Sequence, residues 1–211
     1  RPIASGAISK TKAIVLVIGL AVFLIPTFIF FNYYFQFILV IYILLNFAYS
    51  IRLKHVVVLD ILCLASGFVL RVLAGAFVIS VLISNWLILS TLFVSMFLAV
   101  IKRRSELELI ADTNKTRKVL KSYSINYLDQ LTTISATGLI VCYALYTVSE
   151  RTIQNFHTEN LVITIIFVVY GVFRYLYLMH NKKMGENPTD VIIKDFGMII
   201  NIICYILVVV Y

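Results

Sequence analysis

The sequence predicts an all-α membrane protein, a bundle of transmembrane helices, and three observations support this fold class. Of its 211 residues, 62% are hydrophobic and only 13% are charged, whereas soluble domains contain about 25% charged residues. Apolar runs of about 20 residues, the length that crosses a bilayer as a helix, recur along the chain. The cationic residues gather in alternate connectors between these runs. Because the chain has too few polar residues to form the surface of a soluble protein, we exclude a water-soluble helical bundle.

Seven apolar segments have lengths close to one membrane crossing. They run over residues 13–31, 34–50, 60–80, 85–101, 130–148, 160–179 and 196–211. Backbone N–H and C=O groups in lipid must be hydrogen-bonded within their own segment, so each segment is expected to be a helix. The connectors at Phe31–Asn32 and Ser84–Asn85 are very short, which predicts antiparallel helical hairpins. We interpret residues 1–211 as a single transmembrane domain.

The distribution of Lys and Arg predicts how these helices cross the membrane. Sixteen of the 18 Lys and Arg residues lie in connectors, and 15 of these lie in every second connector, counting from the N-terminal one. Cytoplasmic loops of membrane proteins have this excess of cations. The chain is therefore expected to cross the inner or plasma membrane several times, with its N-terminus and charged loops in the cytoplasm. The net charge of +8 then indicates anionic lipid and loop orientation, and no nucleic-acid partner is expected.

Two further features limit the function classes. The connector over residues 102–129 is too long for a simple turn, and loops of this length are often functional. Its stretch 114–128 is a candidate for a short interfacial helix. Cys63, Cys142 and Cys204 all lie inside apolar segments and form no CxxC or Cys/His pattern, so neither a disulfide nor a metal thiolate is expected.

Arg71 is the most informative single residue because it lies near the middle of an apolar segment. A charge at this depth costs at least about 2.5–3.5 kcal/mol and normally faces the bundle interior or a wet cavity. Gly67 and Gly75 share its helical face and permit close approach of a helix or ligand. Asp60 is about 16 Å away by helix rise and cannot pair with it. Arg71 is therefore a candidate contact for an anionic substrate, although a structural bond to another helix is the alternative.

A mixed cluster of charges follows the fourth apolar segment. It contains Lys102, Arg103, Arg104, Glu106, Glu108 and Asp112. Lys102 and Glu106 are four residues apart and are expected to share a helical face. Such a set could hold a diphosphate directly through Lys and Arg, and indirectly through Mg²⁺, which prefers one or two carboxylates plus substrate oxygens. The alternative is an interfacial anchor with solvated ion pairs, since basic clusters are common after a membrane span.

The other connectors add Lys54 and Asp60 near residues 51–60, and His180 with two lysines near residues 180–195. Arg174 lies close enough to the membrane boundary for its side chain to reach the interface. The sequence contains no readable nucleophilic triad, P-loop or dinucleotide fingerprint. Metal-binding carboxylates and phosphate-binding cations remain, so we expect transfer chemistry on a phosphorylated substrate, with an apolar groove between helices for a lipid chain.

Five stretches of the chain resemble the UbiA-type membrane prenyltransferases. They are RPIASGAIS (1–9), LDILCLASGFVLRVLAGA (59–76), SNWLILSTLFVSMFLAVIKRRSELELI (84–110), RKVLKSYS (117–124) and NPTDVIIKDF (187–196). RPIASG alone is typical of the whole superfamily. The pair GFVLR and KRRSEL resembles the decaprenyl-phosphate phosphoribosyltransferase branch, and the resemblance extends over essentially the whole chain.

This resemblance implies nine transmembrane helices and an active site at the cytosolic face. The implied reaction transfers 5-phosphoribose from phosphoribosyl diphosphate to a polyprenyl phosphate, releases diphosphate and uses Mg²⁺. The family's first aspartate-rich motif would lie just before Arg1, so this chain is expected to contain seven of the nine helices and to lack part of the metal site. The second aspartate-rich motif of the aromatic prenyltransferases is also missing, and Glu106, with Lys102 and Arg103, occupies its place.

The expected site residues follow from these patterns together. We expect catalytic roles for Arg71, Lys102 and Glu106, phosphate binding by Arg1, Lys54, Arg103, Arg104 and Arg117, and metal binding by Glu106, Asp60 and Asp112. Two alternatives remain at this point. One is an aromatic prenyltransferase of the same superfamily, which would consume a prenyl diphosphate and an aromatic acid. The other is a transporter or non-catalytic membrane protein, which inverted halves with broken helices would favour.

Overall fold

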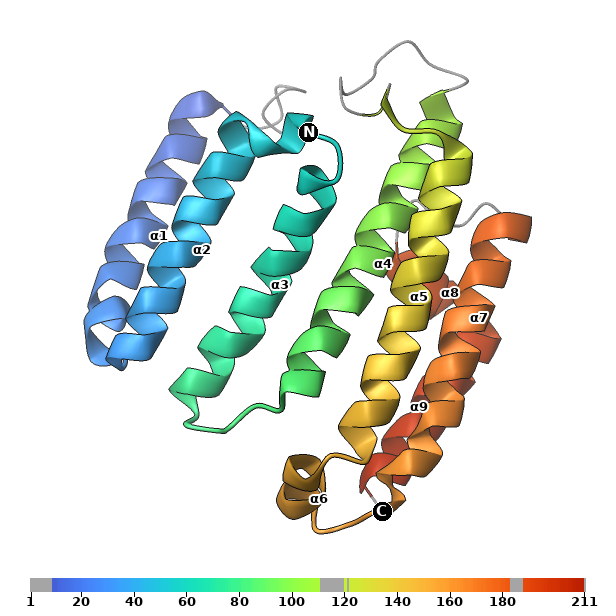
Figure 1. The fold of residues 1–211 in the computed structure, drawn as a ribbon. Coiled ribbons are helices and arrows are strands. Elements are labelled where there is room, and N and C mark those ends of the chain that lie inside the picture. The colour runs from blue at the N-terminus through green and yellow to red at the C-terminus, as the bar shows by residue number, and fades with distance from the viewer. Residues whose placement is uncertain (1–8, 111–119, 121, 183–187, 211) are drawn as a thin grey trace.

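The computed structural model describes residues 9–110, 120, 122–182 and 188–210, and these residues form helices and connecting turns. The elements are α1 (Lys10–Phe30), α2 (Tyr33–Ile51), η1 (Leu53–His55), α3 (Leu59–Val78), α4 (Asn85–Ile110), α5 (Ile125–Thr147), α6 (Glu150–Phe156), η3 (Asn160–Thr164), α7 (Ile165–Lys182), α8 (Pro188–Lys194) and α9 (Phe196–Val210) (Figure 1). Each of the seven predicted apolar segments is helical in this structure. The predicted all-α class is therefore confirmed.

Among the described residues, five helical stretches are long and apolar enough to cross a membrane. They are Tyr33–Ile51, Leu59–Val78, Asn85–Glu108, Ile125–Thr147 and Asn160–Asn181. Two shorter apolar stretches, Thr11–Val22 and Phe196–Val210, lie in α1 and α9. Large apolar side chains are exposed along most of these helices, as expected where lipid takes the place of water. The structure is a polytopic helical bundle.

Two predicted boundaries differ from the structure, and the differences change the surroundings of the charged residues. Helix α4 continues to Ile110, whereas the apolar segment was predicted to end at residue 101. Helix α5 already begins at Ile125, where the Ser124 side chain caps it by accepting a hydrogen bond from the Tyr127 N–H at 3.2 Å. Hydropathy marks the part of a helix that lies in lipid, whereas hydrogen bonding and capping decide where the helix ends. Residues 125–128 are thus the first turn of α5 and not part of a separate interfacial helix.

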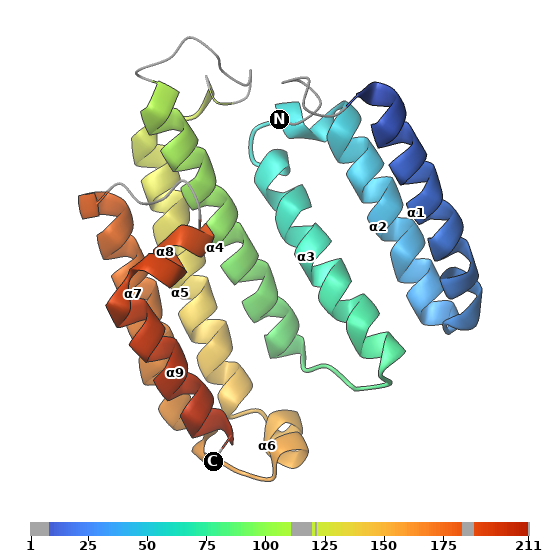
Figure 2. The same cartoon turned by 180° about the vertical axis from the view of Figure 1, so that it is seen from behind.

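The helices pack in chain order for the first half of the bundle. Helix α2 packs on α3, α3 on α4 and α4 on α5, while α7 packs on α5 and α9. Figure 2 shows the same order from behind, with the short α8 near α7 and α9. One buried cluster joins α4, α5, α7, α8 and α9 and contains Phe97, Leu139, Leu178, Val191 and Met198. A second joins the beginning of α3 to α4 and α5.

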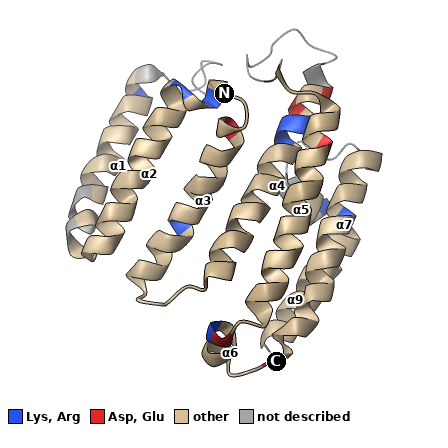
Figure 3. Ribbon diagram, in the orientation of Figure 1, with Lys and Arg blue, Asp and Glu red and all other residues tan. Residues whose placement is uncertain are grey.

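Most charged residues among those described lie, by the position of their backbone, at one end of the bundle (Figure 3). At this end α1 begins, α2 ends, α3 begins, α4 ends and α5 begins (Figure 1). The exceptions include Arg71, within α3, and Glu150 and Arg151 on α6, which lies at the opposite end. The concentration of Lys and Arg in every second connector of the sequence therefore corresponds to one charged end and one nearly uncharged end of the helical bundle.

Candidate active site

A buried ion pair lies at the centre of the charged end. Asp60, in the first turn of α3, is 0% exposed, and Arg103, near the end of α4, is 2% exposed. The Arg103 Nε atom donates a hydrogen bond to Asp60 Oδ2 at 2.8 Å. Moving either charge out of water costs several kcal/mol, so each ion requires the other. The pair connects α3 to α4 at the point where both helices reach this end.

Arg103 also contacts two further residues, which makes it the hub of the cluster. Its Nη1 donates to Glu106 Oε2 at 2.9 Å, and its Nη2 donates to the Tyr49 hydroxyl of α2 at 3.4 Å. The spacing predicted that Glu106 and Lys102 share a helical face. The ion-pair partner of Glu106 is Arg103, while Lys102 is exposed and has no ion-pair partner among the described residues. The guanidinium of Arg103 therefore joins residues from three helices.

Tyr123, just before α5, completes the surroundings of Asp60. Its hydroxyl donates to Asp60 Oδ1 at 2.7 Å and accepts a hydrogen bond from the backbone N–H of Val58, also at 2.7 Å. Burial and the hydrogen bond to Asp60 raise the pKa of Tyr123 above its ordinary value of about 10, so the hydroxyl stays protonated at neutral pH. Sequence analysis did not identify Tyr123, because an aromatic residue next to a membrane boundary is usually an interfacial anchor.

Arg104 forms the hub of a neighbouring group. Its Nε donates to Asp129 Oδ1 of α5, and its Nη1 donates to Glu108 Oε1 at 2.8 Å. Its Nη2 lies 3.3 Å from His180 Nδ1 of α7. The sequence gave no signal for Asp129, since a single acid inside an expected connector has no partner that spacing can identify. Arg104 thus holds α4, α5 and α7 together at the charged end.

The lysines near the cluster are more open to solvent than the two buried arginines, Arg103 and Arg104. Lys54 is half-buried in η1 and, like Lys102, forms no ion pair with any described residue. Arg103 and Arg104 were predicted to bind phosphate, but their guanidinium groups already hold internal partners in this structure. Among the described residues near the cluster, Lys54 and Lys102 are therefore two cations available to an incoming anion. The predicted site residues Arg1, Asp112 and Arg117 lie outside the described residues.

The carboxylates of the cluster differ in how open they are. Both oxygens of Asp60 accept hydrogen bonds, from Arg103 and Tyr123. The side chain of Glu106 is 25% exposed and pairs with Arg103 through one oxygen, and its other oxygen has no hydrogen-bond partner among the described residues. Among the described residues, no group of three or more His, Cys, Asp and Glu is arranged to hold a metal ion. A metal here would therefore need oxygens from a substrate or from residues beyond those described.

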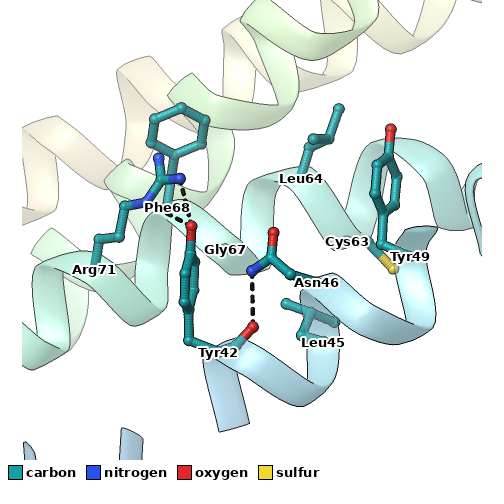
Figure 4. Close-up of a pocket in the computed structure, with 9 residues that line it drawn as sticks. All are labelled: Tyr42, Leu45, Asn46, Tyr49, Cys63, Leu64, Gly67, Phe68 and Arg71. Carbon is teal, nitrogen blue, oxygen red and sulfur yellow. Dashed lines mark hydrogen bonds between the residues drawn. The ribbon is translucent and has the colours of Figure 1, made fainter. Parts of the chain in front are cut away.

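Arg71 lies apart from this cluster, in a pocket of about 80 Å³ between α2 and α3 (Figure 4). Its Nε donates to the Tyr42 hydroxyl at 3.2 Å, and its guanidinium lies over the Tyr42 and Phe68 rings at 5.2 and 5.0 Å from their centroids. The pocket is lined by Tyr42, Leu45, Asn46, Tyr49, Cys63, Leu64, Gly67, Phe68 and Arg71. No described carboxylate pairs with Arg71. Tyr49 lines this pocket and also accepts from Arg103, so it connects the two regions.

One further ion pair was not predicted. Arg174 of α7 holds the Asp195 carboxylate through both oxygens, with Nε–Oδ1 at 3.0 Å and Nη2–Oδ2 at 2.9 Å. Asp195 Oδ1 also accepts from the Met198 N–H at 3.0 Å and so caps α9. The sequence indicated only that the Arg174 side chain is close enough to the membrane boundary to reach the interface, and it gave no partner. The sequence feature that could have indicated this ion pair is an Arg inside one apolar segment and an Asp directly before the next apolar segment.

Comparison with known proteins supports the resemblance seen in the sequence. The chain is 33% identical over 202 residues to a decaprenyl-phosphate phosphoribosyltransferase of Mycolicibacterium smegmatis, covering 92% of this chain and 63% of the relative. It is 29% identical over 196 residues to a protein of the same name from Mycobacterium tuberculosis, covering 92% of this chain and 64% of the relative. A Corynebacterium glutamicum relative of that name is 39% identical over 107 residues, 50% of this chain and 32% of the relative.

The family assignment is based on a match to almost the whole chain. The model of the UbiA prenyltransferase family matches residues 1–190, a range that contains the Asp60–Arg103–Glu106 cluster and the Arg71 pocket. The chain spans a little under two thirds of the length of the first two relatives. Together with the apolar helices, this match shows that the chain belongs to the UbiA prenyltransferase family and is a multi-pass membrane protein.

Proposed function

We propose that this chain forms part of a membrane transferase that moves 5-phosphoribose from phosphoribosyl diphosphate to a polyprenyl phosphate. The observation that carries the proposal is the cluster at the charged end, where Asp60, Arg103 and Glu106 meet beside accessible lysines. A diphosphate leaving group needs such charge at the edge of the bilayer. The names of the relatives support the ribose donor and the lipid acceptor.

The reaction needs charge stabilisation more than a strong base. An oxygen of the lipid phosphate, already ionised, forms a bond to the anomeric carbon of the ribose while the bond from that carbon to the diphosphate oxygen breaks. The electron pair leaves with the diphosphate, and its charge is stabilised by nearby cations. We assign this role to Lys54 and Lys102, which carry no internal ion pair with described residues. Arg103 supports them by holding Glu106 in place.

We propose Mg²⁺ as the cofactor, because it binds substrate diphosphate oxygens together with only one or two carboxylates. Glu106 fits the role of such a carboxylate, since its side chain is partly exposed and one of its oxygens has no partner among the described residues. When bound, Mg²⁺ would neutralise part of the diphosphate charge. Asp60 has both oxygens occupied, so in this arrangement it orients Arg103. Metal binding by Asp60 or Asp112 stays a prediction, as does phosphate binding by Arg1, Arg104 and Arg117.

Arg71 is assigned a separate role from the diphosphate cluster. It is too deep along α3 to contact the same phosphate as Asp60, which is about 16 Å away by helix rise. It has no carboxylate partner among the described residues and lines a pocket that Tyr49 connects to Arg103. We propose that Arg71 contacts an anionic or polar part of a lipid substrate between α2 and α3. We also propose that the charged end faces the cytoplasm.

A supply test with the full-length protein in lipid nanodiscs checks the reaction. The protein is given either labelled phosphoribosyl diphosphate with polyprenyl phosphate, or labelled prenyl diphosphate with an aromatic acid. We expect a phosphoribosylated lipid and free diphosphate in the first reaction only, and loss of product when Mg²⁺ is chelated. Product from the second reaction alone would identify an aromatic prenyltransferase instead. No product in either would remove the transferase assignment.

A further inference from the structure

The turn between α2 and α3 contains a strained residue that the side chain of Tyr123, just before α5, holds in place. Val58 has φ 71° and ψ −43°, and a positive φ is an outlier for a β-branched residue. A strained residue of this kind persists only where its surroundings fix it. The backbone N–H of Val58 donates to the Tyr123 hydroxyl at 2.7 Å. The conformation of this turn is therefore linked to a residue 65 positions later in the chain.

Tyr123 is the only hydroxyl among the described residues that joins this turn to the buried ion pair. It donates to Asp60 Oδ1, whose second oxygen accepts from Arg103. Tyr123 is 6% exposed, so water cannot easily replace its hydroxyl. One oxygen atom thus connects the turn, α3 and, through Asp60, the Arg103–Glu106 pair of α4. Removing it would leave both the Val58 N–H and one Asp60 oxygen without a partner.

The turn that Tyr123 holds contains basic residues. Arg52, Lys54 and His55 lie in or beside η1, three to six residues before Val58. Their position relative to Glu106 depends on the path of this turn. We propose that Tyr123 is a positioning residue, which holds the basic turn at residues 52–58 against the Asp60–Arg103–Glu106 cluster so that both sides contact one diphosphate. This inference depends on the proposed function for its substrate, but its geometry does not.

The chain provides a matched control for the Tyr123 hydroxyl. Tyr127, one turn into α5, stacks on Tyr123 with ring centroids 6.1 Å apart and an interplanar angle of 18°. Tyr127 is exposed, and its hydroxyl has no hydrogen-bond partner among the described residues. Tyr127→Phe therefore removes a hydroxyl from the same aromatic stack without touching Val58 or Asp60. Tyr123→Phe removes the bridging hydroxyl and keeps the ring.

The test measures kinetics and backbone exchange on the same full-length samples in nanodiscs. For Tyr123→Phe we expect the KM for phosphoribosyl diphosphate to rise about fivefold while kcat changes less than about twofold, as expected for losing one hydrogen bond that orients a binding site. Hydrogen exchange at the Val58 amide should be about tenfold faster. Tyr127→Phe should leave both quantities at wild-type values. If Tyr123 had only a structural role, Tyr123→Phe would lower the fraction of folded protein and leave the KM for phosphoribosyl diphosphate unchanged.

Each contrary result has a separate meaning. Unchanged Val58 exchange in Tyr123→Phe would overturn the bridge, and faster exchange with an unchanged KM would overturn the positioning role. Equal KM effects in both variants would assign the effect to the aromatic stack instead. If the wild type does not turn over phosphoribosyl diphosphate, the proposed function fails, and inorganic diphosphate with Mg²⁺ becomes the probe. It should protect residues 52–58 from exchange in the wild type but not in Tyr123→Phe, and equal protection would reject the inference.

Discussion

The buried ion pair between Asp60 and Arg103 is the residue-scale feature on which the charged end depends. Both partners are almost fully buried, and without the Asp60 charge Arg103 keeps only the partly exposed Glu106 as an ion-pair partner among the described residues; breaking a buried pair costs about 3–5 kcal/mol. Asp60→Asn should therefore lower the free energy of unfolding by about that amount, measured by unfolding in detergent. Glu108→Gln is the control, because Arg104 keeps Asp129 and Glu108 is partly exposed, and a loss of at most about 1 kcal/mol is expected. Equal losses in the two variants would show that burial does not distinguish the pairs.

The hydroxyl of Tyr123 gives a pH-dependent prediction at the same scale. Its pKa is raised in the folded protein by burial and by Asp60, so the stability it contributes is fully present below the unfolded pKa of about 10 and is lost as the pH rises toward the folded pKa. The stability difference between wild type and Tyr123→Phe should be constant from pH 6 to 9 and shrink above about pH 10. A difference that shrinks between pH 6 and 9 would contradict the protonated state assigned to Tyr123.

The sequence identified several of these residues but not their partners. Asp60, Arg103 and Glu106 were selected because carboxylates and cations suit a diphosphate. The pairing of Asp60 with Arg103 joins positions 43 residues apart, and no local spacing rule reports such a contact. Tyr123 and Asp129 were missed for the same reason, since each acquires its role only when α5 packs against α4. The i, i+4 spacing of Lys102 and Glu106 indicated a shared helical face, but the ion-pair partner of Glu106 is Arg103, three residues before it.

At the scale of elements, the close contact of α4 with α5 depends on one glycine. A Cβ atom at Gly138 would lie 2.5 Å from two atoms of the Phe93 ring, so the ring or the helix would have to move. Gly138→Ala should lower the stability by about 1–3 kcal/mol, the usual cost of overpacking. Gly75→Ala is the matched control, because a Cβ there meets nothing within 4 Å, and a neutral or slightly stabilising effect is expected in a helix. Thermal unfolding of both variants measures the difference.

Hydrophobic runs predicted all seven apolar helices because each needs a length and polarity set by the bilayer. The same signal could not predict α6 and α8, each only seven residues long. It also missed the last two turns of α4, where the helix leaves lipid and becomes charged. Those turns contain Arg103, Arg104 and Glu106, so residues 102–110, the first part of the predicted loop, are a helix that carries the candidate site. Gly67 faces Tyr42 of α2, in line with the close approach expected on Arg71's face.

At the scale of the whole molecule, the charged end and the α6 end should lie on opposite sides of the membrane. Exposed Ser122 is near the start of α5, and exposed Glu159 follows α6. In a background without cysteines, Ser122→Cys should react with a membrane-impermeant maleimide only from the cytoplasmic side, and Glu159→Cys only from the other side. Labelling of both residues from one side would contradict the order of spans, and exchanged sides would reverse the proposed orientation.

The central claim is that the charged end, and not the rest of the bundle, performs the transfer, and two matched acids test it most directly. Glu106 belongs to the Arg103 cluster, whereas Glu150 begins α6 at the opposite end. We expect Glu106→Gln in the full-length protein to lower the turnover of phosphoribosyl diphosphate at least about tenfold, because it removes charge from the proposed diphosphate site. Glu150→Gln should turn over like the wild type. Wild-type turnover in a correctly inserted Glu106→Gln protein would contradict the account.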